Sequence, residues 1–399
     1  MTQARRRGIR THIINTADRL ARTAEVNALA DEISVVDPDD PADCVRWAKE
    51  QLAQGDRFDI VLGLRDTVLA ATAEVATALG VPGNSPDAIS RVRNKDTGRQ
   101  ALAAAGFRQP AVRLCTDAEQ AVAFLRETVG PWVVKPRDAM GSIGVRKVTG
   151  AEDIPAALAL LPRPDLFLIE EYVDGPEYSV EGVFLQGRPK VLAVTAKQVM
   201  PPPHFVELGH VLPAELPENT RSEIDEQVCA ALTALGLSFG IFHVELWLAA
   251  DGIVLGEVHA RPGGEWLHRL LQYAIPDLEL FGLIFDDWLG HQPRLDLTPT
   301  RAGSSRYFAP PPGRLVEVDG WEQLLAEPAV LHADLNIRPG DVIRPVRQSG
   351  DRSGAIAVGA DTPQRARDLA VKLAAMVDFT TVSPDAAAED MDPSNKDSI

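Results

Sequence analysis

Residues 239–264 read FGIFHVELWLAADGIVLGEVHARPGG, and apolar and polar side chains alternate in two runs on either side of a break that contains glycine. Alternation with a period of two predicts two β-strands. Residues 250–252 suit a three-residue hairpin loop with Gly252 in the left-handed position. Such a loop sets Glu245 directly opposite Glu257, with their Cβ atoms roughly 4.5–5.5 Å apart.

Two carboxylates at that spacing repel each other unless a cation lies between them. Their oxygen atoms are the ligands that Mg²⁺ prefers, including where the ion bridges the phosphates of a nucleotide. The alternative is that Glu245 and Glu257 are two solvated side chains on an exposed sheet face. The rest of the chain decides between these interpretations.

The composition is typical of a globular protein and argues against a nucleic-acid-binding or membrane protein. With 399 residues, 45% of them hydrophobic, the chain can form two or three domains. A net charge of −17 without a basic stripe argues against nucleic acid or an anionic membrane as a partner. No apolar run approaches the roughly 18 residues of a membrane span, and no apolar segment of a signal peptide follows the basic start.

The three cysteines, Cys44, Cys115 and Cys229, lie far apart and show no CxxC spacing. They fit a reducing compartment, and they form neither a disulfide framework nor a zinc site. We therefore expect a cytoplasmic protein.

The first part of the chain has the pattern of a small parallel α/β domain. Residues 10–83 alternate the short apolar runs THIIN, EISVV and DIVLG with helical stretches. The residues before them resemble the end of a helix closed by Gly8, so either the domain lacks an edge element or its start lies upstream. Residues 84–110 predict a junction that holds one helix, with Asn94 and Lys95 near its middle.

Beyond residue 110 the strands follow one another by hairpins rather than crossovers, which indicates an α+β class. After residue 299 come short strands and one helix over residues 363–376, and these predict a lid or closing domain. The end of the chain is acidic with few large apolar residues, which predicts disorder. We therefore expect four parts: an N-terminal α/β domain at 1–95, a central module at 96–298, a C-terminal α+β closing domain at 299–383, and a disordered acidic tail at 384–399.

The segment PWVVKPRDAMGSIGVRKV, residues 131–148, predicts two strands joined by a glycine-bearing loop. Lys135 ends the first strand, and Gly141, Ser142 and Gly144 lie in the loop. Successive backbone N–H groups of such a loop bind phosphate oxygens, and a nearby lysine adds charge. Because the loop precedes a strand, it is neither a Walker A motif nor a Rossmann fingerprint. An ordinary turn is the alternative.

The segment FLIEEYVDGPEYSVEGVF, residues 167–184, predicts a strand that ends at Glu170 and Glu171, a turn, and a returning strand that begins at Glu177. Backbone groups of such a connector, around Val173, can bind the edge of an adenine, and Glu177 can accept hydrogen bonds from ribose hydroxyls. The alternative is a hairpin that carries surface acids.

The order of these elements resembles the ATP-grasp superfamily over about residues 85–295, with a central module of two subdomains between which that family binds its nucleotide. The resemblance implies ATP as cosubstrate and Mg²⁺ as the metal. It assigns the residues as follows: Lys95 and Lys135 hold the phosphates, Gly141, Ser142 and Gly144 close over them, Glu170, Glu171 and Val173 form the adenine connector, Glu177 contacts the ribose, and Glu245 and Glu257 bind the metal.

One position departs from the family pattern. ATP-grasp proteins usually carry asparagine two residues after the second metal glutamate, and this chain has His259. Mg²⁺ prefers oxygen ligands, so His259 binds the metal weakly, contacts phosphate, or favours Mn²⁺. A packed or hydrogen-bonded histidine with no such role is the alternative.

Two further segments resemble the ATP-grasp branch that ligates amino acids, typified by bacterial L-amino-acid ligases. One is HFVELGHVLPAEL, residues 204–216, which we expect to be a long irregular connection. The other is HARPGGEW, residues 259–266. By this resemblance Glu207 and His210 contact the amino-acid substrates, Arg261 stabilises the acyl phosphate and the tetrahedral intermediate, and Gly263, Gly264, Glu265 and Trp266 bound the substrate pocket.

The sequence therefore predicts an ATP-dependent carboxylate–amine ligase that joins amino acids, or another carboxylate and amine, through an acyl phosphate and releases ADP and phosphate. The alternatives are a carboxylase-type or purine-pathway ATP-grasp enzyme and a non-catalytic ATP-binding protein. The oligomeric state stays open, with a homodimer as one option.

Overall fold

The computed structural model describes residues 1–291 and 296–383. The chain forms two compact units, each built from three stretches of sequence. Unit 1 comprises residues 1–109, 173–195 and 216–299, and unit 2 comprises residues 110–172, 196–215 and 300 onward. The acidic tail expected at 384–399 lies outside the described residues, and the boundaries expected for the four parts stay predictions.

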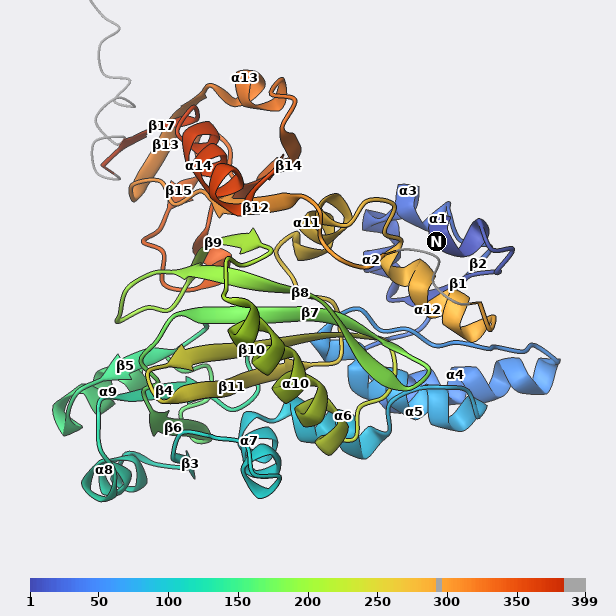
Figure 1. Cartoon of the computed structure of the whole chain (residues 1–399), viewed down its shortest axis with the longest axis horizontal. Helices are drawn as coiled ribbons and strands as arrows, with labels where there is room; N and C mark the ends of the chain where they lie inside the picture. Colours follow the sequence, from blue (N-terminus) through green and yellow to red (C-terminus); the bar gives the residue numbers. More distant parts are fainter. Residues whose placement is uncertain (292–295, 384–399) are drawn as a thin grey trace, which may run out of the picture. The chain divides into compact units, whose positions relative to one another are not determined.

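Unit 1 contains these elements (Figure 1): α1 Thr2–Arg5, β1 His12–Asn15, α2 Ala17–Arg22, α3 Ala24–Asn27, β2 Glu32–Val35, α4 Pro41–Gln54, η1 Asp66–Val68, α5 Leu69–Leu79, α6 Pro86–Arg93, α7 Lys95–Ala104, β7 Glu177–Leu185, the start of β8 Arg188–Val199, α10 Glu218–Ala234, β10 Ile241–Ala249, β11 Gly252–His259, α11 Leu267–Ala274 and α12 Leu280–Trp288.

Unit 2 contains these elements (Figure 1): β3 Val112–Cys115, α8 Ala118–Glu127, β4 Trp132–Pro136, β5 Arg146–Val148, η2 Ala151–Asp153, α9 Ile154–Leu158, β6 Phe167–Glu171, the end of β8, β9 Glu207–Leu212, β12 Ala302–Tyr307, β13 Gly313–Asp319, α13 Trp321–Leu325, β14 Val330–Leu335, β15 Val342–Ile343, η3 Ser349–Asp351, β16 Gly354–Ala360, α14 Pro363–Ala374 and β17 Asp378–Val382.

The N-terminal part of unit 1 pairs β1 with β2 in parallel, as the alternating pattern predicts. The third strand expected there, DIVLG at residues 59–63, is absent, and that prediction is wrong. Val61 instead packs as irregular chain against the cluster of buried apolar residues that includes Val36, Ala48 and Val75. The segment therefore contributes a half-buried apolar side chain to this cluster without a ladder of backbone hydrogen bonds.

The helix expected across Asn94 and Lys95 is two helices. Asn94 has extended backbone angles, φ −93° and ψ 114°, and it ends α6 and precedes α7. Its side-chain amide donates to the Ser90 carbonyl, 3.1 Å away. An asparagine that bonds to nearby backbone favours a helix boundary over a helix interior. Lys95 consequently lies in the first turn of α7 rather than in the middle of a helix.

The sheet of unit 1 has the strand order β11-β10-β7-β8, and α10 packs against β11. Phe242, Val244 and Leu246 of β10 are fully buried, so the alternation in the sequence identifies the core face correctly. On α10, Ile224, Val228, Ala231 and Leu232 are buried. The opposite face of β10 carries the polar side chains.

The hairpin between β10 and β11 differs from the one we expect. Its loop has two residues, 250 and 251, because Ala249 pairs with Gly252. A bulge restores the register, since Leu246 pairs with Leu255 whereas Val244 pairs with Val258. Glu245 therefore faces two residues, Gly256 and Glu257, and the direct pairing of the two glutamates is wrong in detail.

Unit 2 contains a four-stranded antiparallel sheet of order β3-β6-β4-β5, against which α8 and α9 pack (Figure 1). Its core includes Phe124, Val134, Phe167 and Ile169, each at most 3% exposed. The expected hairpin around residues 137–145 is confirmed by the antiparallel pairing of β4 with β5.

The remaining strands of unit 2 run in the order β8-β9-β12-β16-β14, with a separate sheet of order β15-β13-β17. The irregular connection expected at residues 204–216 contains strand β9, so that prediction is wrong for residues 207–212. β9 pairs with β8 on one side and β12 on the other, which satisfies its backbone groups on both edges. No described helix is long and apolar enough to cross a membrane.

Candidate active site

The polar face of unit 1 is built by three neighbouring strands. On this face Trp247 of β10 pairs with Glu177 of β7, and His243 pairs with Glu181 on one side and with His259 of β11 on the other. Because side chains alternate along a strand, alternate residues share the face. We call it the acidic face, and its members are Glu177, Glu181, His243, Glu245, Glu257 and His259.

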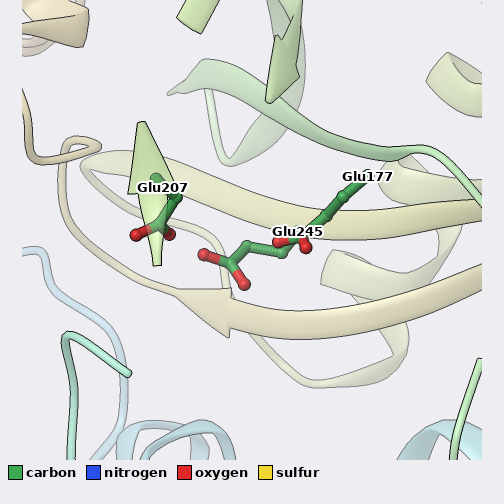
Figure 2. A group of neighbouring side chains, drawn as sticks. All are labelled: Glu177, Glu207 and Glu245. Carbon is green, nitrogen blue, oxygen red and sulfur yellow. The ribbon is translucent and has the colours of Figure 1, made fainter. Parts of the chain in front are cut away.

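Two carboxylates meet at one end of the acidic face. Oxygens of Glu177 and Glu245 lie within 4.8 Å of each other, and both side chains are half-buried. Figure 2 shows these two side chains extending from neighbouring strands; the picture also draws Glu207, which belongs to unit 2. Like charges this close favour a cation between them.

A second pair lies beside the first and is deeply buried. His243 Nδ1 is 3.0 Å from both oxygens of Glu181, which also accepts a hydrogen bond from Ser179 Oγ at 2.8 Å. Burial lowers the pKa of His243, but the charges and hydrogen bonds of Glu181 and Glu245 raise it, to about 9. The imidazole is therefore a cation at neutral pH. Its Nε2 lies 3.6 Å from Glu245 and offsets part of the repulsion there.

Glu257 forms an ion pair with Lys95. Its Oε2 lies 3.1 Å from Lys95 Nζ, and the lysine side chain is 10% exposed. The break at Asn94 produces this contact, because it places Lys95 at the start of α7. His259 Nε2 also approaches Glu257 Oε2, at 3.6 Å.

Asp66 contacts both His259 and Arg261. It is not among the site residues that the sequence predicts. Its Oδ1 accepts from His259 Nδ1 at 3.0 Å, and its Oδ2 accepts from Arg261 Nε at 2.5 Å. Burial raises the pKa of Asp66, but His259 and Arg261 lower it well below its usual range. The aspartate thus fixes the planes of an imidazole and a guanidinium together.

The two glycines after Arg261 are not equivalent. A Cβ on Gly263 would lie 2.8 Å from Glu181 Oε2 and 2.9 Å from His243 Nδ1, whereas a Cβ on Gly264 would meet nothing within 4 Å. Gly263 therefore allows the backbone to pass close to the buried pair. Glu265 and Trp266 follow in left-handed backbone conformations, with φ of 59° and 66°, and α11 begins directly after them.

In unit 2, Lys135 and Glu170 form a buried ion pair. Their charged atoms are 2.7 Å apart, and each residue is 5% exposed. Glu171 points elsewhere: its carboxylate accepts a hydrogen bond from the Ala111 amide at 3.0 Å. Glu171 thereby ties β6 to the start of β3, and Val173 follows as a half-buried residue between β6 and β7.

Three residues of the glycine loop in unit 2 have a left-handed backbone conformation: Gly141 and Gly144, each with φ 68°, and Ser142, with φ 56°. Ser142 Oγ donates to the Phe205 carbonyl at 2.7 Å, and the Gly141 carbonyl accepts from the Ser349 amide at 2.9 Å. The loop is therefore anchored at two points within its own unit. Successive N–H groups in such conformations form concave anion sites.

Glu207 and His210 lie on one face of β9. They are three residues apart, and a bulge at Leu208 brings them to the same side, since Val199 pairs with Glu207 and Lys197 with His210. Glu207 pairs with Lys197 Nζ at 3.1 Å. His210 is 2% exposed, and its Nδ1 lies 3.2 Å from Ser305 Oγ.

Arg352 completes this region of unit 2. It donates to the Glu207 carbonyl at 2.9 Å and lies over the ring of Tyr307 at 3.8 Å. Lys197 and Arg352 were not among the predicted site residues. Lys197 lies four residues before Pro201 and carries no local motif. Arg352 reaches β9 only because β12 and β16 bring distant segments together.

Comparison with known proteins identifies the family. Residues 128–269 match the family described as ATP-grasp domain, and residues 306–382 match L-amino acid ligase C-terminal domain 2. An uncharacterized protein of Sinorhizobium fredii, y4rH, is 30% identical over 344 residues, which cover 83% of this chain and 70% of the relative.

Two further relatives have named activities. Carnosine synthase 1 of Gallus gallus is 28% identical over 325 residues, which cover 74% of this chain but only 34% of that protein. The crystal structure of an L-amino acid ligase from Bacillus licheniformis has the same fold, with a TM-score of 0.79, 23% identity, and coverage of 96% of this chain and 95% of that one. The chain belongs to the ATP-grasp superfamily, in its carboxylate–amine ligase branch, whose members form C–N bonds with ATP.

Proposed function

We propose that this protein joins two amino acids, or another carboxylate and amine, and releases ADP and phosphate. The observation that carries the proposal is the acidic face of unit 1, where Glu245 and Glu257 lie beside cations and Arg261 is fixed by Asp66. Such a face combines metal ligands with a rigid guanidinium, the two features that phosphoryl transfer followed by acyl transfer requires.

The donors on the acidic face fit a divalent metal. Glu245 and Glu257 supply carboxylate oxygens, the ligands that suit Mg²⁺ and Mn²⁺. A bound ion would neutralise charge on the phosphates of ATP. Lys95, which lies 3.1 Å from Glu257, adds a positive charge of the chain's own at the same place.

The residues of unit 2 have proposed roles that follow the family pattern. Lys135 contacts phosphate, the backbone of Gly141, Ser142 and Gly144 covers it, and the end of β6 at Glu170 contacts the adenine. The left-handed geometry of the loop supports the second of these roles. In unit 1, Glu177 and Val173 complete the nucleotide contacts.

The substrate roles fall to residues from two regions. Glu207 and His210, on one face of β9, contact the amino acids, and Gly263, Gly264, Glu265 and Trp266 bound a pocket after Arg261. In the first step the substrate carboxylate attacks the γ-phosphorus of ATP, which forms an acyl phosphate and releases ADP. In the second step an amine displaces phosphate, and Arg261 supports the negative oxygen that forms on the acyl carbon.

The test is a screen of amino-acid pairs for ATP-dependent phosphate release, with mass spectrometry of the products. We expect ADP, phosphate and an amide in equal amounts for at least one pair. Phosphate release that depends on bicarbonate and yields no amide would replace this proposal with a carboxylase-type enzyme. ATP binding without turnover across the screen would favour a non-catalytic role.

A further inference from the structure

His259 stands where ATP-grasp proteins usually carry asparagine, and its imidazole is held in a defined orientation. We propose that Asp66 and His259 form a carboxylate–imidazole pair that supplies a nitrogen ligand, His259 Nε2, to a divalent cation bound by Glu257. The proposal deepens the metal assignment of the proposed function and rests on it.

The contact with Asp66 decides which ring nitrogen carries the proton. Asp66 Oδ2 accepts a hydrogen bond from Arg261 Nε. Asp66 Oδ1 lies 3.0 Å from His259 Nδ1. Arg261 Nη2 also approaches His259 Nδ1, at 3.3 Å, but the contact with Asp66 is shorter. A carboxylate only accepts, and a lone pair on Nδ1 would repel it, so Nδ1–H donates to Asp66. In the neutral ring the other nitrogen, Nε2, then carries the lone pair.

Nε2 is directed at a proposed metal ligand. It lies 3.6 Å from Glu257 Oε2, too far for a good hydrogen bond. Two ligand atoms that share one ion at about 2.1 Å lie about 3.0–3.5 Å apart. The observed separation is close to that range, so a small side-chain movement suffices for shared coordination.

The arrangement matches a recurring feature of metal sites, in which a histidine ligand donates its other N–H to a carboxylate that fixes the ring and its tautomer. Asparagine at this position offers only an amide oxygen. Imidazole shifts the preference of a site from Mg²⁺ toward Mn²⁺ and later first-row ions. This chain is therefore expected to bind Mn²⁺ more tightly, relative to Mg²⁺, than it would with asparagine at residue 259.

His243 is the natural comparison, because it too is held by a carboxylate and lies 3.6 Å from a glutamate. Two differences favour His259 as the ligand. The side chain of His243 is 8% exposed and that of His259 is 14% exposed. His243 Nδ1 is also 3.0 Å from both oxygens of Glu181, an arrangement that suits a buried cation rather than a ligand.

The experiment uses the full chain with Mn²⁺ and ADP, and pulsed electron paramagnetic resonance detects nitrogen coupled to the ion. Protein with ¹⁵N-labelled histidine separates imidazole from adenine and backbone nitrogen. We expect a histidine coupling in the wild type and in His243→Asn, and its loss in His259→Asn. Isothermal titration should show the Mn²⁺-over-Mg²⁺ affinity ratio falling about 10-fold in His259→Asn, and Asp66→Ala weakening Mn²⁺ binding about 10–100-fold.

Bound Mn²⁺ without a histidine coupling in the wild type would overturn the inference and leave the ligase function intact. A coupling that disappears in His243→Asn but persists in His259→Asn would overturn it as well. Failure of the proposed function is distinguished separately, because it appears as an absence of amide product with Mg²⁺ in the wild type. Circular dichroism of each variant checks that the protein is folded.

Discussion

At the scale of single residues, the acidic face contains two similar arrangements side by side. In each, a carboxylate holds a histidine through Nδ1 and the histidine points Nε2 toward a glutamate: Glu181 and His243 toward Glu245, and Asp66 and His259 toward Glu257. The two rings pair across β10 and β11, with centroids 5.7 Å apart. In each arrangement an imidazole therefore lies between two carboxylates, and Glu257 has Lys95 as a nearer partner at 3.1 Å.

Removal of the Glu257 carboxylate should stop catalysis without unfolding the protein. Glu257 is half-buried and pairs with Lys95 at the edge of the face, so Glu257→Gln keeps the shape of the side chain and removes the negative charge of a proposed metal ligand. We expect a fall in ADP formation on the order of 100-fold or more. A coupled ADP assay measures it, with Glu50→Gln on the exposed side of α4 as the control. ADP release at the wild-type rate would contradict the metal assignment.

The glycines at 263 and 264 give a matched test of close packing. A methyl group at Gly263 would fall within 3 Å of the Glu181 and His243 side chains and of Leu267. We therefore expect Gly263→Ala to lower the free energy of unfolding by about 1–3 kcal/mol. Gly264→Ala has open space and should change it by less than about 0.5 kcal/mol. Urea denaturation of both variants measures the difference, and equal effects would contradict the packing argument.

The sequence identified part of this face for physical reasons. Glu245, Glu257 and His259 lie on alternating strands, and a period of two reveals their common face. Asp66 lies 193 residues from His259 and in a short 3₁₀ helix, so no local pattern indicates that contact. Glu181 is a buried acid whose partner is on another strand, and register between strands cannot be derived from either strand alone.

At the scale of elements, the β10–β11 hairpin differs from the predicted one in two ways, a shorter loop and a bulge, and their effects on register cancel. The loop is one residue shorter than expected, which by itself would shift Glu257 to the core face. The bulge at Gly256 compensates, and a Cβ there would lie 2.9 Å from the Trp247 ring and 3.0 Å from the Glu245 carbonyl. Glycine at 256 therefore permits the bulge, and the bulge keeps both glutamates on the acidic face.

The attachment of the turn after α1 to α12 should depend on pH. Arg7 forms two hydrogen bonds with the Asp286 carboxylate, at 2.7 Å and 2.6 Å, and these bonds lower the pKa of Asp286 below its usual 3.8. A depressed carboxyl pKa adds stability that is present above the unfolded-state pKa and is lost as pH falls through the folded-state pKa. Asp286→Asn should therefore lower the free energy of unfolding by about 1–2 kcal/mol at pH 7.

The difference between wild type and Asp286→Asn should shrink as the pH falls below 3.8. Urea denaturation from pH 7 down to pH 3 measures it. Asp18→Asn is the control, because the Asp18 pair with Arg22 is exposed and contributes little. A difference that stays constant over this pH range would contradict a role for the Arg7–Asp286 bonds.

At the scale of the whole molecule, the two units do not follow the order of the chain. The segment after residue 299 looks like a closing domain in sequence because it has its own strands and helix. In the structure, Ser305 of β12 pairs with His210 of β9, and Gly303 pairs with Leu212. Local pattern predicts the closing domain, and the pairing of distant segments adds that its strand β12 shares a sheet with β9.

Removal of residues 300–399 should therefore damage unit 2 and spare unit 1. The truncated chain keeps all three segments of unit 1 but leaves β9 without its partner β12. Unpaired backbone groups and newly exposed apolar side chains, including the fully buried Leu212, favour aggregation. We expect strong binding of a hydrophobic dye, and hydrogen exchange that is fast in residues 207–212 but protected in residues 241–249. Full protection of residues 207–212 would contradict the dependence of β9 on β12.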